Sequence, residues 1–343
     1  MMLLKIKPLE ELVLSRTPIA THDVFGVHYV RGTPLPTTII GLIGSLLNLT
    51  YSGNEITGLG ELVIKLRDKF SCKEPIIKGP LIYFDELRNE PYIQVGDSLV
   101  PINRIKWIDA VGKKLFYINA IDHKYIVKCE EGHRIGIKLR RGYEDSVDKA
   151  VSPGFMYRYS TVRYSTIDGE VLTPTITYAL NCNTSEVREI ARVGGESRVA
   201  IVEIIKSEEV IGIDKLVAPL DADEDYYIAL SPIPLLPKRA ALHTLLLSDD
   251  VVESGVVSEV IGLPPLIRSD NDVERIKEME IQAKRRIERL NLGFSEVVKR
   301  RRPQILALPQ GTVIKSRRVN YSDVSELLRL LWNIGFSSLL KIS

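Results

Sequence analysis

The sequence predicts an α+β fold made of two similar domains in tandem, and three observations support this prediction. The chain has 343 residues, about twice the usual length of a single domain. Hydrophobic residues make up 45% of it and no low-complexity tract interrupts them, so we expect folded structure throughout. A helix, a glycine turn and a strand are expected at residues 185–205 and again at residues 323–342, which indicates an internal repeat.

The chain begins with a strand, a loop and a helix. Residues 2–6 form a short apolar run that predicts a strand. Residues 39–49 predict a helix that Pro36 opens and that Thr37 or Thr38 caps. We expect residues 15–36 between them to be a long loop, and long loops in compact domains are often functional.

The middle of the first half alternates with period two. Residues 123–141 alternate apolar and basic side chains on both sides of a turn at residues 130–133, which contains Gly132. This pattern predicts a hairpin with one apolar and one basic face. Residues 155–165 predict a further strand, in which tyrosines alternate with arginines.

The later elements complete two similar units. Further strands are expected at residues 172–180, 199–205, 226–232, 296–298, 305–314 and 336–342, and helices at residues 185–192, 271–290 and 323–333. The acidic run at residues 221–225 marks the expected boundary between a first domain at residues 1–222, with an inserted hairpin at about residues 104–145, and a second domain at residues 223–343. This order fits two ferredoxin-like (RRM-like) βαββαβ units in tandem. Such units present an open antiparallel sheet on which single-stranded RNA commonly binds.

The composition excludes several classes of protein. Cys72, Cys129 and Cys182 are isolated and odd in number, which argues against a disulfide framework and a zinc knuckle and favours a reducing cytoplasm. The first residues lack the features of a secretion signal, and the longest apolar stretches are too short to span a bilayer. We therefore expect a cytoplasmic protein that makes no contact with a membrane.

The charge is unevenly distributed, although the net charge is only +2. Residues 124–141 hold six Lys or Arg against two acids, and residues 297–318 hold seven Lys or Arg and no acid. Residues 214–225 hold five acids against one lysine. The basic segments predict a polyanionic partner such as nucleic acid.

Several segments, in order along the whole chain, resemble the RAMP superfamily of RNA-binding proteins from CRISPR systems. Within that superfamily the chain resembles the third subunit of the Cmr (type III-B) effector complex. The matching segments are PLPTTIIG at residues 34–41, RIGI at 134–137, MYR at 156–158 with VR at 162–163, GGESR at 194–198, LPQGTV at 308–313 and GF at 335–336. The resemblance implies a tandem ferredoxin-like fold that grips the repeat-derived 5′ tag of the guide RNA (crRNA). It also implies contacts with the large polymerase-like subunit, with the neighbouring backbone RAMP subunit and, indirectly, with target RNA.

The glycine turn is the first candidate RNA site. It comprises Gly194, Gly195, Glu196, Ser197 and Arg198. Paired glycines let a backbone approach a phosphate closely, and Arg198 supplies the charge. The alternative is that Gly194 is only the glycine cap of the preceding helix.

The tyrosine and arginine strand is the second candidate. Tyr157 and Tyr159 are suited to stacking on bases, and Arg158 and Arg163 to pairing with phosphates. The alternative is an ordinary strand whose tyrosines face the core. The remaining predicted RNA contacts are Arg134, Lys138, Arg140 and Arg141 of the basic hairpin, Arg16 and Arg31 of the long loop, and Gln310 and Gly311. The charges of the hairpin would also be expected on an edge that resists strand addition.

Catalytic motifs are lacking, so the leading prediction is a non-catalytic protein without cofactor or metal. The five histidines are scattered, and no nucleotide-binding loop or metal-ligand spacing is present. One alternative is a metal-independent ribonuclease that processes guide RNA, with His22 as a general acid or base. Another is a protein-interaction scaffold without RNA contact.

Overall fold

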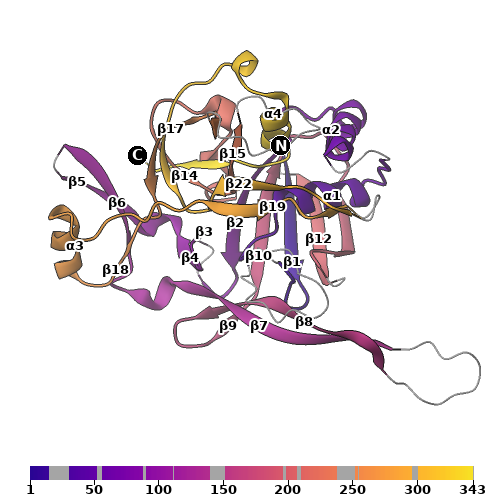
Figure 1. The fold of residues 1–343 in the computed structure, drawn as a ribbon, viewed down its shortest axis with the longest axis horizontal. Coiled ribbons are helices and arrows are strands. Elements are labelled where there is room, and N and C mark those ends of the chain that lie inside the picture. Colours follow the sequence, from indigo (N-terminus) through magenta and orange to yellow (C-terminus); the bar gives the residue numbers. More distant parts are fainter. Residues whose placement is uncertain are drawn as a thin grey trace, which may run out of the picture.

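The computed structural model describes residues 1–14, 31–51, 56–87, 90–110, 112–139, 151–195, 198–206, 210–237, 252–253, 255–295 and 300–342 (Figure 1). Strands dominate this part of the chain, and its α-helices are α1 (Pro36–Leu46), α2 (Thr57–Phe70), α3 (Asp270–Lys277) and α4 (Glu326–Asn333). Short 3-10 turns lie at Ile102–Arg104, His123–Tyr125, Ile213–Lys215, Pro219–Asp221 and Tyr321–Asp323. The predicted α+β class is confirmed.

A large antiparallel sheet of ten strands forms the body of the molecule. In spatial order its strands are β11 (Val187–Arg192), β12 (Val199–Lys206), β1 (Met2–Pro8), β10 (Pro174–Leu180), β2 (Ile77–Phe84), β3 (Tyr92–Val95), β4 (Ser98–Pro101), β7 (Val127–Leu139), β8 (Val151–Thr166) and β9 (Val171–Leu172).

Smaller sheets pack around this body. One consists of β13 (Leu216–Val217), β24 (Leu339–Lys341), β14 (Tyr226–Ala229), β23 (Val313–Ser316) and β17 (Val257–Gly262). Another consists of β16 (Val252–Glu253), β15 (Ile233–Pro237), β22 (Gln304–Leu308) and β19 (Glu288–Asn291). The others are β18 (Leu266–Ile267) with β6 (Lys113–Asn119) and β5 (Ile105–Ala110), and the pair β20 (Phe294–Ser295) and β21 (Arg300–Arg301).

Two sets of four strands share one spatial order. In the first set the order is β12-β1-β10-β2, which is the fourth, first, third and second strand in chain order. In the second set the order β24-β14-β23-β17 follows the same scheme. Helices α1 and α2 lie in the first connection of the first set, and α4 lies in the last connection of the second set. The internal repeat is therefore present in the strand order, although the helices differ between the two halves.

The predicted helix at residues 185–192 is wrong, because this segment is strand β11. It pairs with β12 over six positions, from Val187 opposite Ile204 to Arg192 opposite Val199. The apolar residues Val187, Ile190 and Ala191 have a helical spacing, which misled the prediction. Pairing with a neighbouring strand overrides this local pattern. The predicted glycine turn consequently joins two strands and does not follow a helix.

The predicted hairpin at residues 123–141 is also wrong in its pairing. β7 continues straight through the expected turn, and Gly132 lies opposite Thr161 of β8. The partner of β7 is thus the tyrosine and arginine strand, which is part of the sixteen-residue β8. Figure 1 shows β7 and β8 running together away from the body of the molecule.

Other boundaries differ from the predictions in smaller ways. α1 begins at Pro36 after Leu35, which makes no side-chain cap, so Thr37 and Thr38 lie inside the helix. α3 is eight residues long and the predicted helical segment after it ends in β19. The predicted strand at residues 305–314 is divided into β22 and β23, because Gly311 adopts a φ of 81° between them. The predicted strand at residues 296–298 lies outside the described residues.

The cysteine pattern argued against a disulfide framework, but the described residues contain a disulfide. Cys72 and Cys182 are bonded to each other across 110 residues, and Cys129 is not part of this disulfide. The bond joins the end of α2 to the end of β10, where the backbone is also paired: the amide of Lys73 donates to the carbonyl of Asn181 over 2.8 Å. Sequence spacing could not reveal this pair, because the two cysteines meet only when the helix packs on the sheet.

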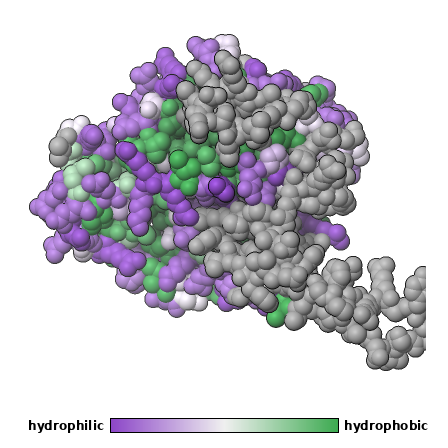
Figure 2. Space-filling view, in the orientation of Figure 1, coloured by the Kyte–Doolittle hydropathy of each residue, from purple (hydrophilic) through white to green (hydrophobic). Residues whose placement is uncertain are grey.

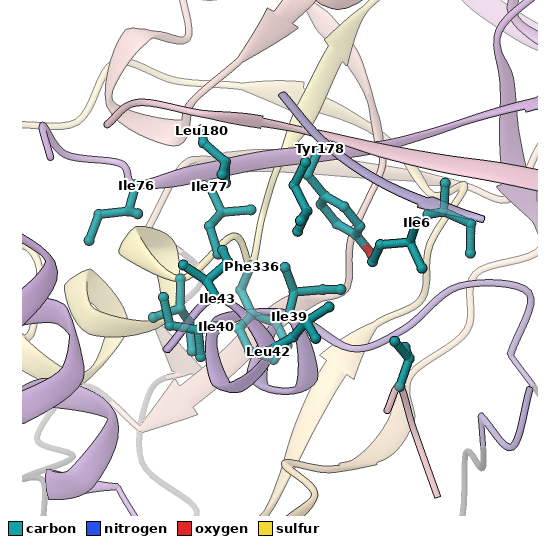
Figure 3. Packing of buried hydrophobic residues seen from close by; sticks show 14 of the residues in the cluster. Ile6, Ile39, Ile40, Leu42, Ile43, Ile76, Ile77, Tyr178, Leu180 and Phe336 are labelled. Atoms are coloured by element: carbon teal, nitrogen blue, oxygen red, sulfur yellow. The ribbon is translucent and has the colours of Figure 1, made fainter. Parts of the chain in front are cut away.

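The larger core lies between the sheet and its helices. Figure 3 shows Ile39 and Ile43 of α1 pointing toward Tyr178 of β10 and Ile77 of β2, with Phe336 beside them. All five residues have at most 1% of their surface exposed. Because strand side chains alternate between faces, Leu4 and Ile6 of β1 join this core, and Leu3 faces the opposite side.

The opposite face of the sheet is covered by the second half of the chain. Leu3, Leu81 and Ile93 pack there with Ile228 of β14 and Leu340 of β24, among others. The open sheet expected as an RNA platform is therefore absent from the centre of the described sheet, where both faces are buried. Figure 2 shows hydrophilic residues over much of the described surface on one face of the molecule, with apolar residues gathered toward its middle.

Candidate nucleic-acid interface

The segment that follows β1 lies across β8. The amide of Val162 donates to the carbonyl of Leu12 over 2.9 Å, and the two residues form an isolated bridge. Leu12 is buried, so the segment is fixed in place. This contact positions the two preceding residues, Glu10 and Glu11, against the arginines of the large sheet.

Glu11 holds two of the predicted RNA-binding arginines. Nε and Nη2 of Arg163 donate to its Oε1 over 2.9 and 2.8 Å, and Nη2 of Arg134 donates to its Oε2 over 3.3 Å. Oγ1 of Thr161 donates to the same Oε2 over 2.7 Å. The Glu11 side chain is 20% exposed, whereas those of Arg163 and Arg134 are 45% and 54% exposed. The carboxylate therefore lies beneath guanidinium groups that solvent reaches.

The strand register explains why these groups meet. Arg134 lies opposite Tyr159, and Tyr159, Thr161 and Arg163 share one face of β8 because they are two residues apart. Gly132 lies opposite Thr161, and a Cβ at this position would collide with the Thr161 hydroxyl and lie 3.1 Å from Oε2 of Glu11. Because Gly132 has no side chain, the Glu11 carboxylate fits against β7 at this position. Gly132 is therefore not the turn residue that the sequence predicted.

Glu10 holds the third arginine. Arg198 pairs with Oε2 of Glu10 and donates a hydrogen bond to the hydroxyl of Tyr159, whose ring centroid lies 5.5 Å from the guanidinium carbon. The amide of Val199 donates to Oε1 of Glu10 over 3.1 Å. Arg198, Arg163 and Arg134 therefore lie on one acidic dipeptide. We call these three arginines with Glu10 and Glu11 the arginine cluster.

The charges of the arginine cluster shift its pKa values. Burial by itself raises the pKa of the Glu11 carboxyl, but hydrogen bonds from Thr161 and Arg163 and the charges of Arg163 and Arg134 outweigh it and lower this pKa. The pKa of Glu10 is lowered in the same way, because Arg198 and the Val199 amide outweigh the effect of burial. Both carboxyls are thus held in their charged form.

The glycine turn packs against the same segment. Gly194 adopts a φ of 78°, and a Cβ there would lie 2.6 Å from the carbonyl oxygen of Val13. The amide of Gly195 donates to that oxygen over 3.0 Å, and a Cβ on Gly195 would lie 3.0 Å from Cγ1 of Val13. Glycine is therefore required at position 194 by its positive φ and by the approach of the chain's own backbone, and Gly195 packs closely against the Val13 side chain. The predicted close approach of a phosphate is not needed to explain either residue.

Three predicted contact residues are buried, which does not fit an RNA-facing role. Arg31 is 1% exposed, and its Nη2 donates to Oε1 of Glu288 over 2.8 Å. Gln310 is 5% exposed, and its amide donates to Oγ1 of Thr33 and to the carbonyl of Leu230. Gly311 lies so close to β3 that a Cβ would be 2.6 Å from the Cα of Val95. These residues connect the two halves of the chain.

The other predicted contacts lie wholly or partly outside the described residues. Arg16, Arg140, Arg141, Glu196, Ser197 and the alternative catalytic residue His22 fall in the segments that are not described. The backbones of Lys138, Tyr157 and Arg158 belong to β7 and β8, but their side chains are not described. Their predicted contacts with RNA stay predictions.

The described residues also bear on other kinds of site. Within them, no group of three or more His, Cys, Asp or Glu side chains is placed to hold a metal ion. None of the helices described above combines the length and apolar character that crossing a membrane requires. The acidic residues Asp223 and Asp225 make ion pairs with Arg318 and Lys341.

Sequence reasoning missed Glu10 and Glu11, the residues that bring the arginines together. Two adjacent acids shortly after a strand were a signal, since they interrupt a basic and apolar N-terminal stretch. Their partners are 123 to 188 residues away, so only the register of β8 and the turn before β12 reveals the contact.

Comparisons with known proteins agree with the resemblance seen in the sequence. No family model matches the chain. A curated protein from Saccharolobus solfataricus, the CRISPR system CMR subunit Cmr3, is 21% identical over 333 residues that cover 92% of this chain and 86% of that protein.

Two solved structures share the fold along almost the whole chain. A chain of the type III-B Cmr-beta complex bound to cognate target RNA matches with a TM-score of 0.56 and 17% identity, over 99% of this chain and 96% of that one. A chain of the same complex bound to target RNA and AMPPnP matches with a TM-score of 0.59 and 19% identity, over 99% of both chains. The resemblance of this chain to the third subunit of the type III-B Cmr complex is thereby confirmed.

Proposed function

We propose that this chain is a non-catalytic subunit of a type III-B CRISPR complex that grips the repeat-derived 5′ tag of the guide RNA. In this role it bridges the large polymerase-like subunit to the neighbouring backbone subunit and reaches target RNA only indirectly. The likeness to Cmr3 along 92% of the chain supports the assignment to such a complex.

The arginine cluster is the observation that carries the RNA-binding part of the proposal. Arg134 and Arg163 expose about half of their side chains while each guanidinium is hydrogen-bonded to Glu11. A guanidinium has five donors in a planar fork, so a group bound on one edge still presents donors to a phosphate on another. Tyr159 beside Arg198 adds an aromatic ring of the kind that stacks on unpaired bases.

The repeated strand order supports the fold that we propose for this role. Each half arranges four strands as fourth, first, third and second, which is the order of a ferredoxin-like unit. In the first half β11 replaces the second helix, and in the second half strands replace the first. We assign the RNA to the arginine cluster, on the paired stretch of β7 and β8 that carries Arg134 and Arg163 and beside the turn before β12. The central strands are covered on both faces.

The test is RNA binding by a matched set of variants. A double variant, Arg163→Ala with Arg198→Ala, removes two guanidinium groups from the arginine cluster. The control is Arg188→Ala on the edge strand β11. The Arg188 side chain is 74% exposed and pairs with Glu203 of β12. Affinity for a single-stranded RNA that carries the 5′ tag is measured by fluorescence anisotropy at several salt concentrations.

The double variant should lose at least tenfold in affinity, because a hydrogen bond to a charged group contributes about 1.5–3 kcal/mol. Its salt dependence should also be weaker than that of the unchanged protein, because fewer phosphates are neutralised. The control should bind normally. Equal affinities of the double variant and the control, at equal melting temperatures, would refute the proposed site.

The non-catalytic part of the proposal has its own test. Repeat RNA incubated with the purified protein, with and without divalent metal ions, should remain intact. Specific cleavage that disappears in His22→Ala would replace the proposal with a metal-independent ribonuclease.

A further inference from the structure

We propose that Glu10 and Glu11 are specificity-determining residues, whose carboxylates compete with RNA phosphates for the three arginines of the cluster. This inference rests on the proposed function and adds to it a reason why binding favours a particular RNA. A carboxylate offers an arginine the same two-oxygen edge as a phosphate, so each acid occupies the position that an RNA oxygen would otherwise take.

The charges determine the direction of the effect. Three guanidinium groups face two carboxylates within hydrogen-bonding distance, so most of the positive charge is neutralised inside the protein. A single phosphate of an arbitrary RNA gains little binding free energy at the cluster, because the guanidinium that it contacts already has a carboxylate partner. An RNA that places several phosphates and a base against the cluster at once compensates for the lost contacts. The acids therefore penalise weak and unspecific binding more than specific binding.

The geometry distinguishes the two acids. Glu11 lies under its arginines, so a phosphate approaches Arg134 and Arg163 from the exposed side while Glu11 competes from below. Glu10 is more exposed than its partner, at 35% against 19% for Arg198, so an RNA must displace Glu10 in order to reach Arg198. Thr161 and the Val199 amide hold the two carboxylates in these positions without contributing charge.

The matched variants are Glu11→Gln and Glu131→Gln. Glutamine keeps the shape of Glu11 and an oxygen that accepts from Thr161, but it removes the charge. Glu131 lies on β7, accepts a hydrogen bond from Ser160 and lies 3.7 Å from Nδ1 of His133, and among the described residues it pairs with no arginine. Its substitution therefore changes the net charge equally without touching the cluster. Glu10→Gln is the second variant of the cluster, in case Glu11→Gln does not fold.

The measurement is the affinity of each variant for two single-stranded RNAs of equal length, one with the 5′ tag and one of unrelated sequence. Glu11→Gln should bind the unrelated RNA about three- to tenfold more tightly than the unchanged protein does. Its affinity for the tagged RNA should increase less, so the ratio of the two affinities should fall. The slope of log affinity against log salt concentration should become steeper, since an arginine freed from its internal anion binds a phosphate with full release of counterions. Glu131→Gln should leave both the preference and the slope unchanged.

The outcomes separate this inference from the proposed function. If Glu11→Gln and Glu10→Gln each weaken binding, or leave preference and slope as in Glu131→Gln, the acids do not compete with RNA and the inference is wrong. Arg163→Ala would then still lower RNA affinity if the proposed function holds. If Arg163→Ala has no effect on RNA affinity, the proposed site itself fails, and this inference fails with it.

Discussion

Arg31 and Glu288 form a buried ion pair between the two halves of the chain, with 2.8 Å between Nη2 and Oε1. Their side chains are only 2% and 8% exposed. The amide of Arg31 also donates to the carbonyl of Leu14 over 2.8 Å, which ties the pair to the segment that carries Glu10 and Glu11.

Removal of one partner of this pair should destabilise the protein strongly. Arg31→Met leaves Glu288 charged and buried, so the free energy of unfolding should fall by about 3–5 kcal/mol. The double variant Arg31→Met with Glu288→Leu should recover part of this loss, because no unpaired charge remains. Urea unfolding of the single and double variants measures the coupling. Additive losses would show that the two charges do not interact.

Gly132 should tolerate no side chain, unlike a helical glycine with open space. Gly132→Ala places a Cβ against Thr161 and Glu11, so we expect a loss of about 1–3 kcal/mol and weaker RNA binding. The control is Gly41→Ala in α1, where a Cβ would meet nothing within 4 Å and the helix should gain about 0.5–1 kcal/mol. Thermal melts of both variants should therefore shift in opposite directions. An unchanged melting temperature of Gly132→Ala would contradict the described position of Glu11 against β7.

Elements whose own apolar pattern matches the face that they bury could be predicted from the sequence. The strands at residues 2–6 and 199–205 and the helix at residues 323–333 were found in nearly the correct places, because their apolar patterns match the faces that they bury. The segment at residues 185–192 was assigned to a helix, since its apolar spacing is helical and only its pairing with β12 makes it a strand.

The candidate site was predicted only in part. Arg134, Arg163 and Arg198 were all predicted to contact RNA, and the structure brings them together. Their common anchor was not predicted, because Glu10 and Glu11 are distant in sequence from all three. Arg31, Gln310 and Gly311 were predicted to contact RNA, but they are buried between the two halves of the chain. The sequence alone does not show whether a polar residue or a glycine in a segment that resembles the family faces solvent or the other half of the protein.

The disulfide gives a prediction for the purified protein. Under denaturing, non-reducing conditions, alkylation should modify Cys129 and leave Cys72 and Cys182 protected. Reduction, or Cys72→Ser, should lower the free energy of unfolding by about 2–4 kcal/mol, because the bond closes a long loop in the unfolded chain. Cys129→Ser is the control and should leave the response to reductant unchanged. Alkylation of all three cysteines before reduction would contradict the bond.

The lowered pKa values of Glu10 and Glu11 predict an acid-dependent loss of stability. Carboxyls whose pKa is lower in the folded state stabilise it at every pH above their ordinary value near 4.5. This contribution is lost as the pH falls from that value through the folded-state pKa. The urea midpoint of the unchanged protein should therefore decrease over this range more than that of the double variant Glu10→Gln with Glu11→Gln. Parallel pH profiles would show that these carboxyls are not linked to folding.

The shared second core has a consequence for how the chain can be divided. Leu3 and Leu81 come from the first half, and Ile228 and Leu340 from the second, yet they bury one another. A polypeptide cut between residues 222 and 223 would yield two pieces that each expose an unfinished apolar face. We expect neither piece to remain in solution alone, and we expect the two to reassemble when they are produced together in one cell. At the boundary that the acidic run suggests, the backbone can then be cleaved, but the two parts on either side of it do not fold independently.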